Sequence, residues 1–430
     1  MSYRPGLPHM AYFRALADAP SEQSSGWRCT LAGLVAMRLI DAWATEDPLP
    51  DAGLRALERA INMMDVDSLE RGPLRALGDA LIAEQRGRTE AEESPVLLRT
   101  REYAESLWHA AEWVLASDAC RTVIRNARTT SEREIVPLAY DRLGHCLLAR
   151  GRQDAAVEAF QAGRSFATTH GDFRSDLFLR ISEARVERLR GSYPAAECIL
   201  DEVIAEATFG SLPDLRARAT HDRGVTAYER GDNARALTLY FRALEEYGTD
   251  TGADRVLADI ALAVLKFGYH DIARHVLQIL ETDSIEYVQK WTATLNLMRI
   301  ATLDDDESLF DGYRRSLTRV RLPVRLQAHY HLLAAQGWLR FDQPLMARRE
   351  LGRARHVAGR YRITEISEEL ETSLRALESQ SPICATILDA PPPTSPELRR
   401  LIERAPAAAL AWRSGRRCVS DSYRLGTGAT

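Results

Sequence analysis

The chain has 430 residues, of which 45% are hydrophobic and 27% charged, and its formal net charge is -5 with a pI near 6.1. This composition can form a large core or a long repeat array, and its acidic balance argues against a general nucleic-acid binder. The six cysteines contain no CxxC pair, so neither a zinc site nor a disulfide framework is predicted. No signal peptide and no apolar stretch long enough to span a bilayer is visible, so we expect a cytoplasmic protein without membrane association.

Residues 1–26 are expected to be flexible, and residues 27–94 are predicted to be helical. Three segments of the second region, "WRCTLAGLVAMRLIDAW", "DAGLRALERAINMM" and "PLRALGDALIAEQ", carry apolar residues at steps of three and four. The region has no clear register with the rest of the chain. It is interpreted either as a helical cap or as degenerate repeats, and it shows no clear DNA-reading helix.

Three segments that begin at Asp141, Ser182 and Asp222 repeat one pattern. Each reads as a helix, a turn at a glycine and a second helix. The turn glycines Gly151, Gly191 and Gly231 are spaced by 40 residues. Aligned with them are the small residues Gly144, Ala184 and Gly224, the alanines Ala156, Ala196 and Ala236, and the larger residues Phe160, Leu200 and Tyr240.

The spacing has a physical reason. Two antiparallel helices approach closely where small side chains face each other, so Gly144 is predicted to face Ala156, and Gly224 to face Ala236. A glycine inside a helix costs ~1 kcal/mol relative to alanine, which implies a packing role. The aromatic residue four positions after the alanine is expected to fill the gap toward the next unit. The turn glycines are predicted to end the first helices in a left-handed conformation.

This pattern resembles the tetratricopeptide repeat (TPR), which has small residues in both helices and an aromatic residue in the second. The resemblance implies an all-α fold, an α-solenoid of stacked antiparallel helix pairs that form a TPR-like superhelix. About seven pairs are expected over residues 95–378. Weaker copies are marked by Cys120, Ile124 and Ala127, by Ala261, Gly268, Ala273 and Leu277, by Leu309, Tyr313 and Ser316, and by Ala335, Ala347, Leu351 and Ala354.

Residues 379–430 are predicted to be a Pro-rich linker and a basic, partly disordered tail. Pro391 to Pro393 favour an extended conformation, and one short helix is expected from Pro396 to Arg404. Two interpretations stay open for the tail. It is either a solvated segment or a basic docking segment that folds back or binds an acidic partner.

The sequence contains no motif of a nucleotide-binding loop, a metalloprotease or a serine hydrolase, and neither an enzyme activity nor a cofactor is predicted. His329 and His331 are two residues apart on a helix and would point to different faces. Asp304 to Glu307 lack the spacing of a calcium loop and are interpreted as a turn between two helices.

The TPR resemblance implies that the first helix of each pair lines a concave groove in which a partner binds. An Arg-rich groove would suit carboxylates, phosphates or an acidic peptide. Alternatively, these arginines are solvated or pair with nearby acids such as Glu229. The Lys and Asn residues of a carboxylate clamp are absent, so a chaperone tail is not the expected ligand. The candidate groove residues are Asp141, His145, Arg185, Arg188, Arg218, His221, Tyr228, Arg255, Gln336 and Arg340.

Two functions follow as hypotheses. The first is a non-enzymatic scaffold that binds a protein or peptide, with an acidic partner as one option. The second is a bacterial regulatory receptor that responds to a short peptide or small ligand, with the N-terminal helices as its effector part. Nucleic acid is not the expected partner.

Overall fold

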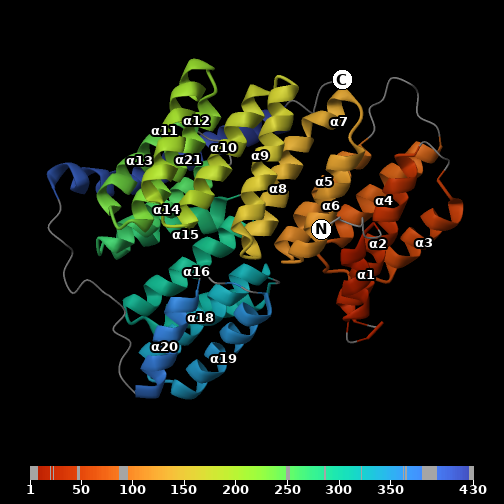
Figure 1. Cartoon of the computed structure of the whole chain (residues 1–430). Coiled ribbons are helices and arrows are strands. Elements are labelled where there is room, and N and C mark those ends of the chain that lie inside the picture. Colours follow the sequence, from red (N-terminus) through yellow and green to blue (C-terminus); the bar gives the residue numbers. More distant parts are fainter. Residues whose placement is uncertain are drawn as a thin grey trace. The chain divides into compact units, whose positions relative to one another are not determined.

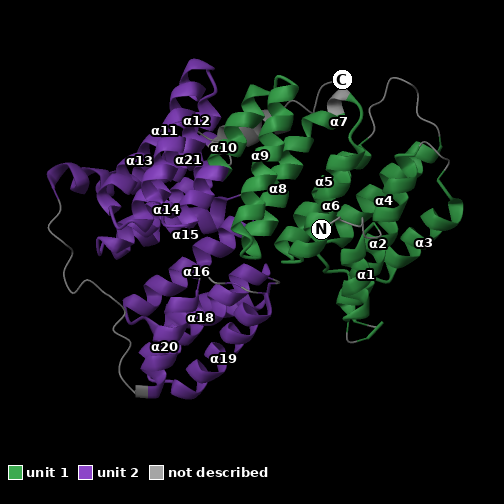
Figure 2. Ribbon diagram, viewed as in Figure 1, with its two compact units in different colours: residues 1–182 green, residues 183–430 purple. Residues whose placement is uncertain are grey.

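The computed structural model describes residues 8–425, except 20, 23, 46–48, 87–94, 248–251, 285–286, 321, 362, 364–365 and 380–394, and it does not describe the side chains of 130–131 and 416–425. The described residues form helices α1 to α21 and no strand (Figure 1). The chain divides into two compact units, residues 1–182 and 183–430 (Figure 2).

Unit 1 begins with helices α1 to α4, which precede the seven helix pairs. The three helices predicted between residues 27 and 94 are present. The first of them packs against the other two and against α1. The helices are α1 (Met10–Ala17), α2 (Ser25–Trp43), α3 (Asp51–Asn62) and α4 (Arg71–Gln85).

Seven helix pairs follow, and they make the fold an all-α, TPR-like solenoid. Helix α10 begins in unit 1 and ends in unit 2. In unit 2 the second helix of one pair packs on the first helix of the next, as α13 does on α14 and α15 on α16. The pairs are α5/α6 (Val96–His109, Trp113–Asn126), α8/α9 (Val136–Ala149, Gln153–Thr169), α10/α11 (Phe173–Leu189, Tyr193–Phe209), α12/α13 (Pro213–Glu229, Asn233–Tyr247), α14/α15 (Gly252–Lys266, His270–Asp283), α16/α17 (Tyr287–Leu303, Glu307–Thr318) and α18/α19 (Val324–Arg340, Pro344–Tyr361). The remaining helices are α7 (Thr130–Glu134), α20 (Ser367–Ser379) and α21 (Pro396–Leu425).

All seven turns inside the pairs share one geometry. Each contains one residue with a positive φ, and the next amide donates to a carbonyl five residues earlier, as Arg152 does to Leu147 at 2.9 Å. This is the Schellman closure of a helix. It confirms the predicted role of the turn glycines, and it shows why the flanking pairs were hard to recognise, because three of the left-handed residues are not glycine. The seven are Ala111, Gly151, Gly191, Gly231, Gly268, Asp305 and Asp342.

The sequence alignment of two flanking pairs, α16/α17 and α5/α6, to the central repeat pattern was wrong. In α17 the buried residues are Phe310 and Leu317, whereas the predicted core position Leu309 is 43% exposed. The alignment slipped by one residue because the left-handed position is held by Asp305. In α6 the buried positions include Ala116, Cys120 and Val123, and not Ile124 and Ala127, because the turn lies at Ala111.

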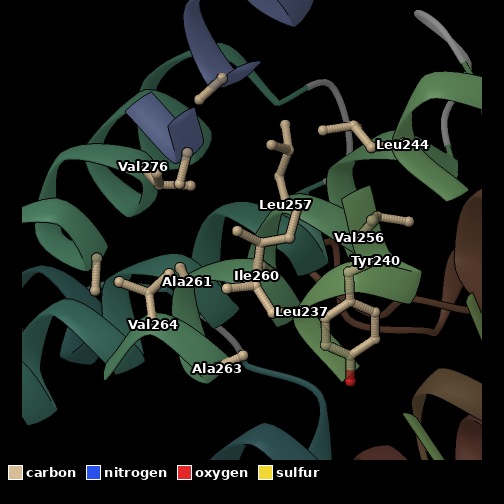
Figure 3. Close-up of a cluster of buried hydrophobic side chains, with 14 of the residues drawn as sticks. Leu237, Tyr240, Leu244, Val256, Leu257, Ile260, Ala261, Ala263, Val264 and Val276 are labelled. Atoms are coloured by element: carbon tan, nitrogen blue, oxygen red, sulfur yellow. The ribbon is translucent and has the colours of Figure 1, made fainter. Parts of the chain in front are cut away.

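The small residues of the first helices pack against aromatic rings of their own pair. A Cβ on Gly144 would lie 2.2 Å from the Phe160 ring, and one on Gly224 would lie 2.6 Å from the Tyr240 ring. The expectation that the aromatic residue reaches toward the next unit is therefore corrected, since each ring lies over the glycine of its own first helix. The glycines are required because any larger side chain would displace these rings. Figure 3 shows Tyr240 within the central core of unit 2.

The N-terminus contains a docked helix where flexibility was expected. Helix α1 is held by His9, which is 3% exposed. Its Nδ1 lies 2.6 Å from Asp118 Oδ1 and its Nε2 lies 3.1 Å from Asp41 Oδ2. An ionised carboxylate only accepts hydrogen bonds, so both ring nitrogens must donate and the imidazole is protonated. Burial alone would lower the pKa of His9, but the two carboxylates raise it to about 9.

The C-terminal tail contains a helix that docks on unit 2. Instead of ending at Arg404, α21 continues through Pro406 to Leu425. Ile402, Ala405, Ala409 and Trp412 are buried in the same core cluster as α13, α14 and α15. Of the two interpretations of the tail, the structure supports the segment that folds back. In Figure 3 the blue ribbon of α21 lies beside Val276 of α15.

Candidate functional site

In unit 1 the predicted groove residues Asp141 and His145 are buried in structural contacts. Ser182 Oγ donates to Asp141 Oδ1 at 2.5 Å, and His145 Nε2 lies 3.4 Å from the same oxygen. The His145 ring lies against Trp108 and Phe160, with centroids 6.3 and 5.5 Å away. These contacts account for both side chains without a ligand.

In unit 2 the first helices are joined by an inter-pair ladder of polar contacts, which we define as Arg185–Asp222, Arg188–Glu229 and His221–Asp259. Arg185 Nη2 lies 3.4 Å from Asp222 Oδ1, and the buried Arg188 pairs with Glu229. His221 Nε2 lies 2.7 Å from Asp259 Oδ2. Each contact links one first helix to the first helix of the next pair.

The ladder changes the electrostatics of the buried Asp222. Burial by itself raises the pKa of a carboxyl group, but the charges of Arg185 and then Arg188 hold the pKa of Asp222 below its usual value. Arg185 and Arg188 are therefore partly structural, because their charges compensate the buried carboxylate of Asp222. This agrees with the alternative that first-helix arginines pair with nearby acids.

A second group of side chains extends the ladder across unit 2. We call it the first-helix cluster and define it as Tyr228 of α12, Asp259 of α14, Arg299 of α16, Arg325 and His329 of α18, and Glu369 of α20. The cluster combines hydrogen-bond donors, acceptors and both signs of charge from five helices.

The pKa values show that members of this cluster lie close enough to influence one another. Burial raises the pKa of Tyr228, and Arg299, Asp259 and Glu369 all act on it. Burial and then the charge of Arg325 lower the pKa of His329. Burial and the charge of Arg185 lower the pKa of Arg325. Charged side chains on first helices that are far apart in sequence therefore influence one another.

The other predicted groove residues differ in exposure and have other neighbours. Arg255 is exposed and Arg218 half-buried, and both act on the Tyr247 hydroxyl, whose pKa burial raises to about 12. Gln336 Nε2 donates to Ser373 Oγ at 3.4 Å. Arg340 binds both carboxylate oxygens of Asp305 at 2.5 Å, which places it at the α16–α17 turn.

Sequence reasoning missed Asp259, Arg299, Arg325 and Glu369. Two of them could have been found from their distance to the left-handed turn residue. Asp259 lies nine residues before Gly268, as Asp222 does before Gly231. Arg299 lies six residues before Asp305, as Arg185 does before Gly191, but the absence of a turn glycine hid this correspondence.

The acidic run and the paired histidines have structural roles. Asp306 caps α17, since its Oδ1 accepts from the Leu309 amide at 2.9 Å, and Asp304 Oδ1 lies 2.5 Å from His270 Nδ1. His331 Nδ1 lies 2.6 Å from Glu350 Oε2, whereas His329 belongs to the first-helix cluster. The predicted inter-helix turn at residues 304–307 is confirmed.

Comparisons with known proteins give a distant likeness only. No family model matches the sequence, and no curated protein matches it significantly. Among solved structures, a Rap protein complexed with Competence and Sporulation Factor is similar at 12% identity and a TM-score of 0.47, over 80% of this chain and 100% of the other. The TPR domain of P58(IPK) is similar at 14% identity and a TM-score of 0.19, over 73% of this chain and 98% of that domain. At these values the likeness assigns neither a ligand nor a site, and the TPR-like fold rests on the turns and packing of the helix pairs themselves.

Within the part of the chain that the structure describes, no helix combines the length and the apolar character needed to cross a bilayer.

Proposed function

We propose that this chain is a non-enzymatic interaction scaffold that binds a protein or peptide along the first helices of unit 2. The observation that carries the proposal is the first-helix cluster, in which five helices bring polar side chains to one region. A solenoid of helix pairs offers an extended surface of this kind, because equivalent positions of successive pairs are presented side by side.

The chemistry of the partner follows from the arginines that are not engaged in the inter-pair ladder. Among the described residues, Arg255 and Arg299 make no ion pair, whereas Arg185 and Arg188 are engaged with Asp222 and Glu229. A guanidinium group suits a carboxylate through paired hydrogen bonds. The proposed partner therefore carries acidic side chains, and it places an apolar or hydrogen-bonding group against the half-buried Tyr228.

The test compares proteins captured from the native host by the full-length wild type and by an Arg255→Ala/Arg299→Ala variant. A matched control is Arg349→Ala/Arg355→Ala, which removes two exposed arginines from the second helix α19. We expect the first variant to lose its partner and the control to retain it, with helicity unchanged in both. Native mass spectrometry identifies what is bound. A stable protein supports the scaffold, a short peptide or small molecule supports the regulatory receptor, and an identical set of partners for all three chains would exclude this face.

A further inference from the structure

The outer surface of α13 and α15 differs in character from that of the preceding second helices. Phe241 lies ten residues after its turn glycine and is 3% exposed, whereas Gln161 and Asp201 hold the equivalent positions of α9 and α11 and are exposed. Ile279 of α15 is also buried, and its equivalent in α11 is the exposed Glu202. Two neighbouring second helices thus carry buried apolar residues at positions where α11 carries the exposed Asp201 and Glu202.

Helix α21 covers this apolar surface. Its buried residues Ile402, Ala405, Ala409 and Trp412 recur at steps of three and four and form one stripe. Ion pairs flank the stripe, with Arg404 Nη2 3.1 Å from Glu245 Oε1 and Arg413 Nε 2.9 Å from Asp283 Oδ2. The Arg404 guanidinium also lies 5.2 Å from the centre of the Phe241 ring. This is the arrangement of an amphipathic helix bound to a helical groove.

The helical state of α21 depends on this docking. Pro406 lies inside the helix, where it removes a backbone hydrogen bond and its ring clashes with the preceding turn. The buried stripe continues on both sides of Pro406, so contacts with α13–α15 hold the two halves in line. Two of its four fully buried residues are alanines, which bury little apolar area, and the Arg404–Glu245 pair is more than half exposed. Folding and docking of α21 are therefore coupled, and the docked state has only a modest advantage over release.

We propose that the outer surface of α13 and α15 is an exchangeable helix-binding site, which α21 occupies in its own chain and which α21 of a second copy can also occupy. The second copy is the occupant because its α21 carries the stripe and the two arginines that match Phe241, Glu245 and Asp283. Residues 380–394 lie between α20 and α21, and a fully extended chain of this length spans about 50 Å, which sets the reach available for exchange.

The first experiment measures binding in trans. A fluorescein-labelled peptide of residues 395–415 is titrated with the full-length chain, and its anisotropy is recorded. The peptide is expected to bind several-fold more tightly to an Arg404→Glu chain than to the wild type, because repulsion from Glu245 weakens the chain's own α21. Arg400→Glu, an exposed charge change of the same sign on α21, is the matched control and should behave as the wild type. An unlabelled peptide with Arg404→Glu should compete several-fold less well than the unaltered peptide.

The second experiment tests the second copy as occupant. In an Arg404→Glu chain and in a Glu245→Arg chain, α21 faces a like charge within its own chain. When the two chains are mixed, exchange pairs opposite charges in both directions. Sedimentation should show an association constant about tenfold larger for the mixture than for either chain alone.

Both substitutions are at exposed positions, so the chains are expected to fold, and circular dichroism and melting check that they do. If the chains fold and the mixture associates no more than its components, the second copy is not an occupant. If the peptide also fails to bind the Arg404→Glu chain, the surface is not exchangeable and α21 is a permanent part of the fold.

Discussion

The terminal helices α1 and α21 both dock on repeat units, but they do so by opposite means. Helix α1 is held at its start by a buried imidazolium between Asp41 and Asp118, with Arg125 Nη2 2.6 Å from Asp41 Oδ1 on the outer side. Helix α21 is held by an apolar stripe with ion pairs at its edges. A buried charge network requires every partner and depends on pH, whereas apolar docking depends mainly on buried area and responds little to pH.

The largest effect is expected from removing the buried charge of α1. His9→Ala leaves the carboxylates of Asp41 and Asp118 without their shared donor, and breaking such a buried pair costs about 3–5 kcal/mol. Hydrogen exchange of the full-length chain should show loss of protection in α1 and the adjoining part of α2. The exposed His170 provides the control, and its replacement by alanine should change nothing. Unchanged protection of α1 in the His9 variant would contradict the buried-charge account.

Truncating the apolar anchor of α21 should have the next largest effect. Trp412 is 3% exposed, and Trp412→Ala is expected to weaken docking by about 3 kcal/mol. Hydrogen exchange should then rise in α21 and in the outer faces of α13 and α15, and α1 should keep its protection. Leu410, which is 42% exposed on the same helix, serves as the control, since its truncation should cost below about 0.5 kcal/mol.

Raising the pH should weaken the docking of α1 but not that of α21 in the wild type. The pKa of His9 is about 9 in the folded chain and 6.5 when unperturbed, so its contribution is complete below pH 6.5 and is lost as the pH rises through 9. About 2 kcal/mol should be lost by pH 8. Exchange rates corrected for the intrinsic effect of pH should increase in α1 but not in α21, whose arginine–carboxylate pairs keep their charges. Equal responses of the two helices would contradict the comparison.

Acidification should act on the same network through Asp41. Burial raises its pKa, but His9 and Arg125 lower it to about 2, from 3.8 when unperturbed. The contribution of Asp41 is present above pH 3.8 and is lost as the pH falls toward 2. The docking of α1 is therefore expected to be strongest between these acid and alkaline limits.

The smallest effect is expected from salt at the edge of α21. Arg404 and Glu245 are more than half exposed, so their ion pair contributes below about 1 kcal/mol and is screened at high ionic strength. Melting of the wild type in about 0.05 M and 1 M NaCl, compared with Arg404→Ala, should show a slightly larger salt dependence for the wild type. Identical salt dependence would show that the apolar stripe alone holds α21.

The sequence predicted most of the repeat architecture because its determinants are local. A turn glycine, a small residue seven positions earlier and an alanine five positions later lie within two adjoining helices. The predictions slipped at Ala111 and Asp305, where a residue other than glycine takes the left-handed conformation. There the Schellman hydrogen bond and the buried neighbours decide the position of the turn, and a single glycine no longer marks it.

The candidate site was only partly predictable for a related reason. Periodicity identified which side chains lie on first helices, so Arg185, His221 and Tyr228 were found. It did not indicate that Arg185 compensates Asp222 or that Arg325 comes close to Arg185. Such contacts depend on how successive pairs are rotated and stacked, which no short window of sequence contains.

The sequence by itself thus determined the helix pairs and the glycine-marked turns of the central units, because these depend on residues fewer than about 20 positions apart. The structure added that Gly144 and Gly224 lie against the aromatic rings of their own pairs. Only the tertiary structure decided how the terminal helices α1 and α21 form and dock. His9 finds its partners at Asp41 and Asp118, and α21 continues through Pro406 because distant residues of α13 and α15 bury it on both sides of the break. Local propensity ends a helix before proline, and here the burial of the stripe outweighs that propensity.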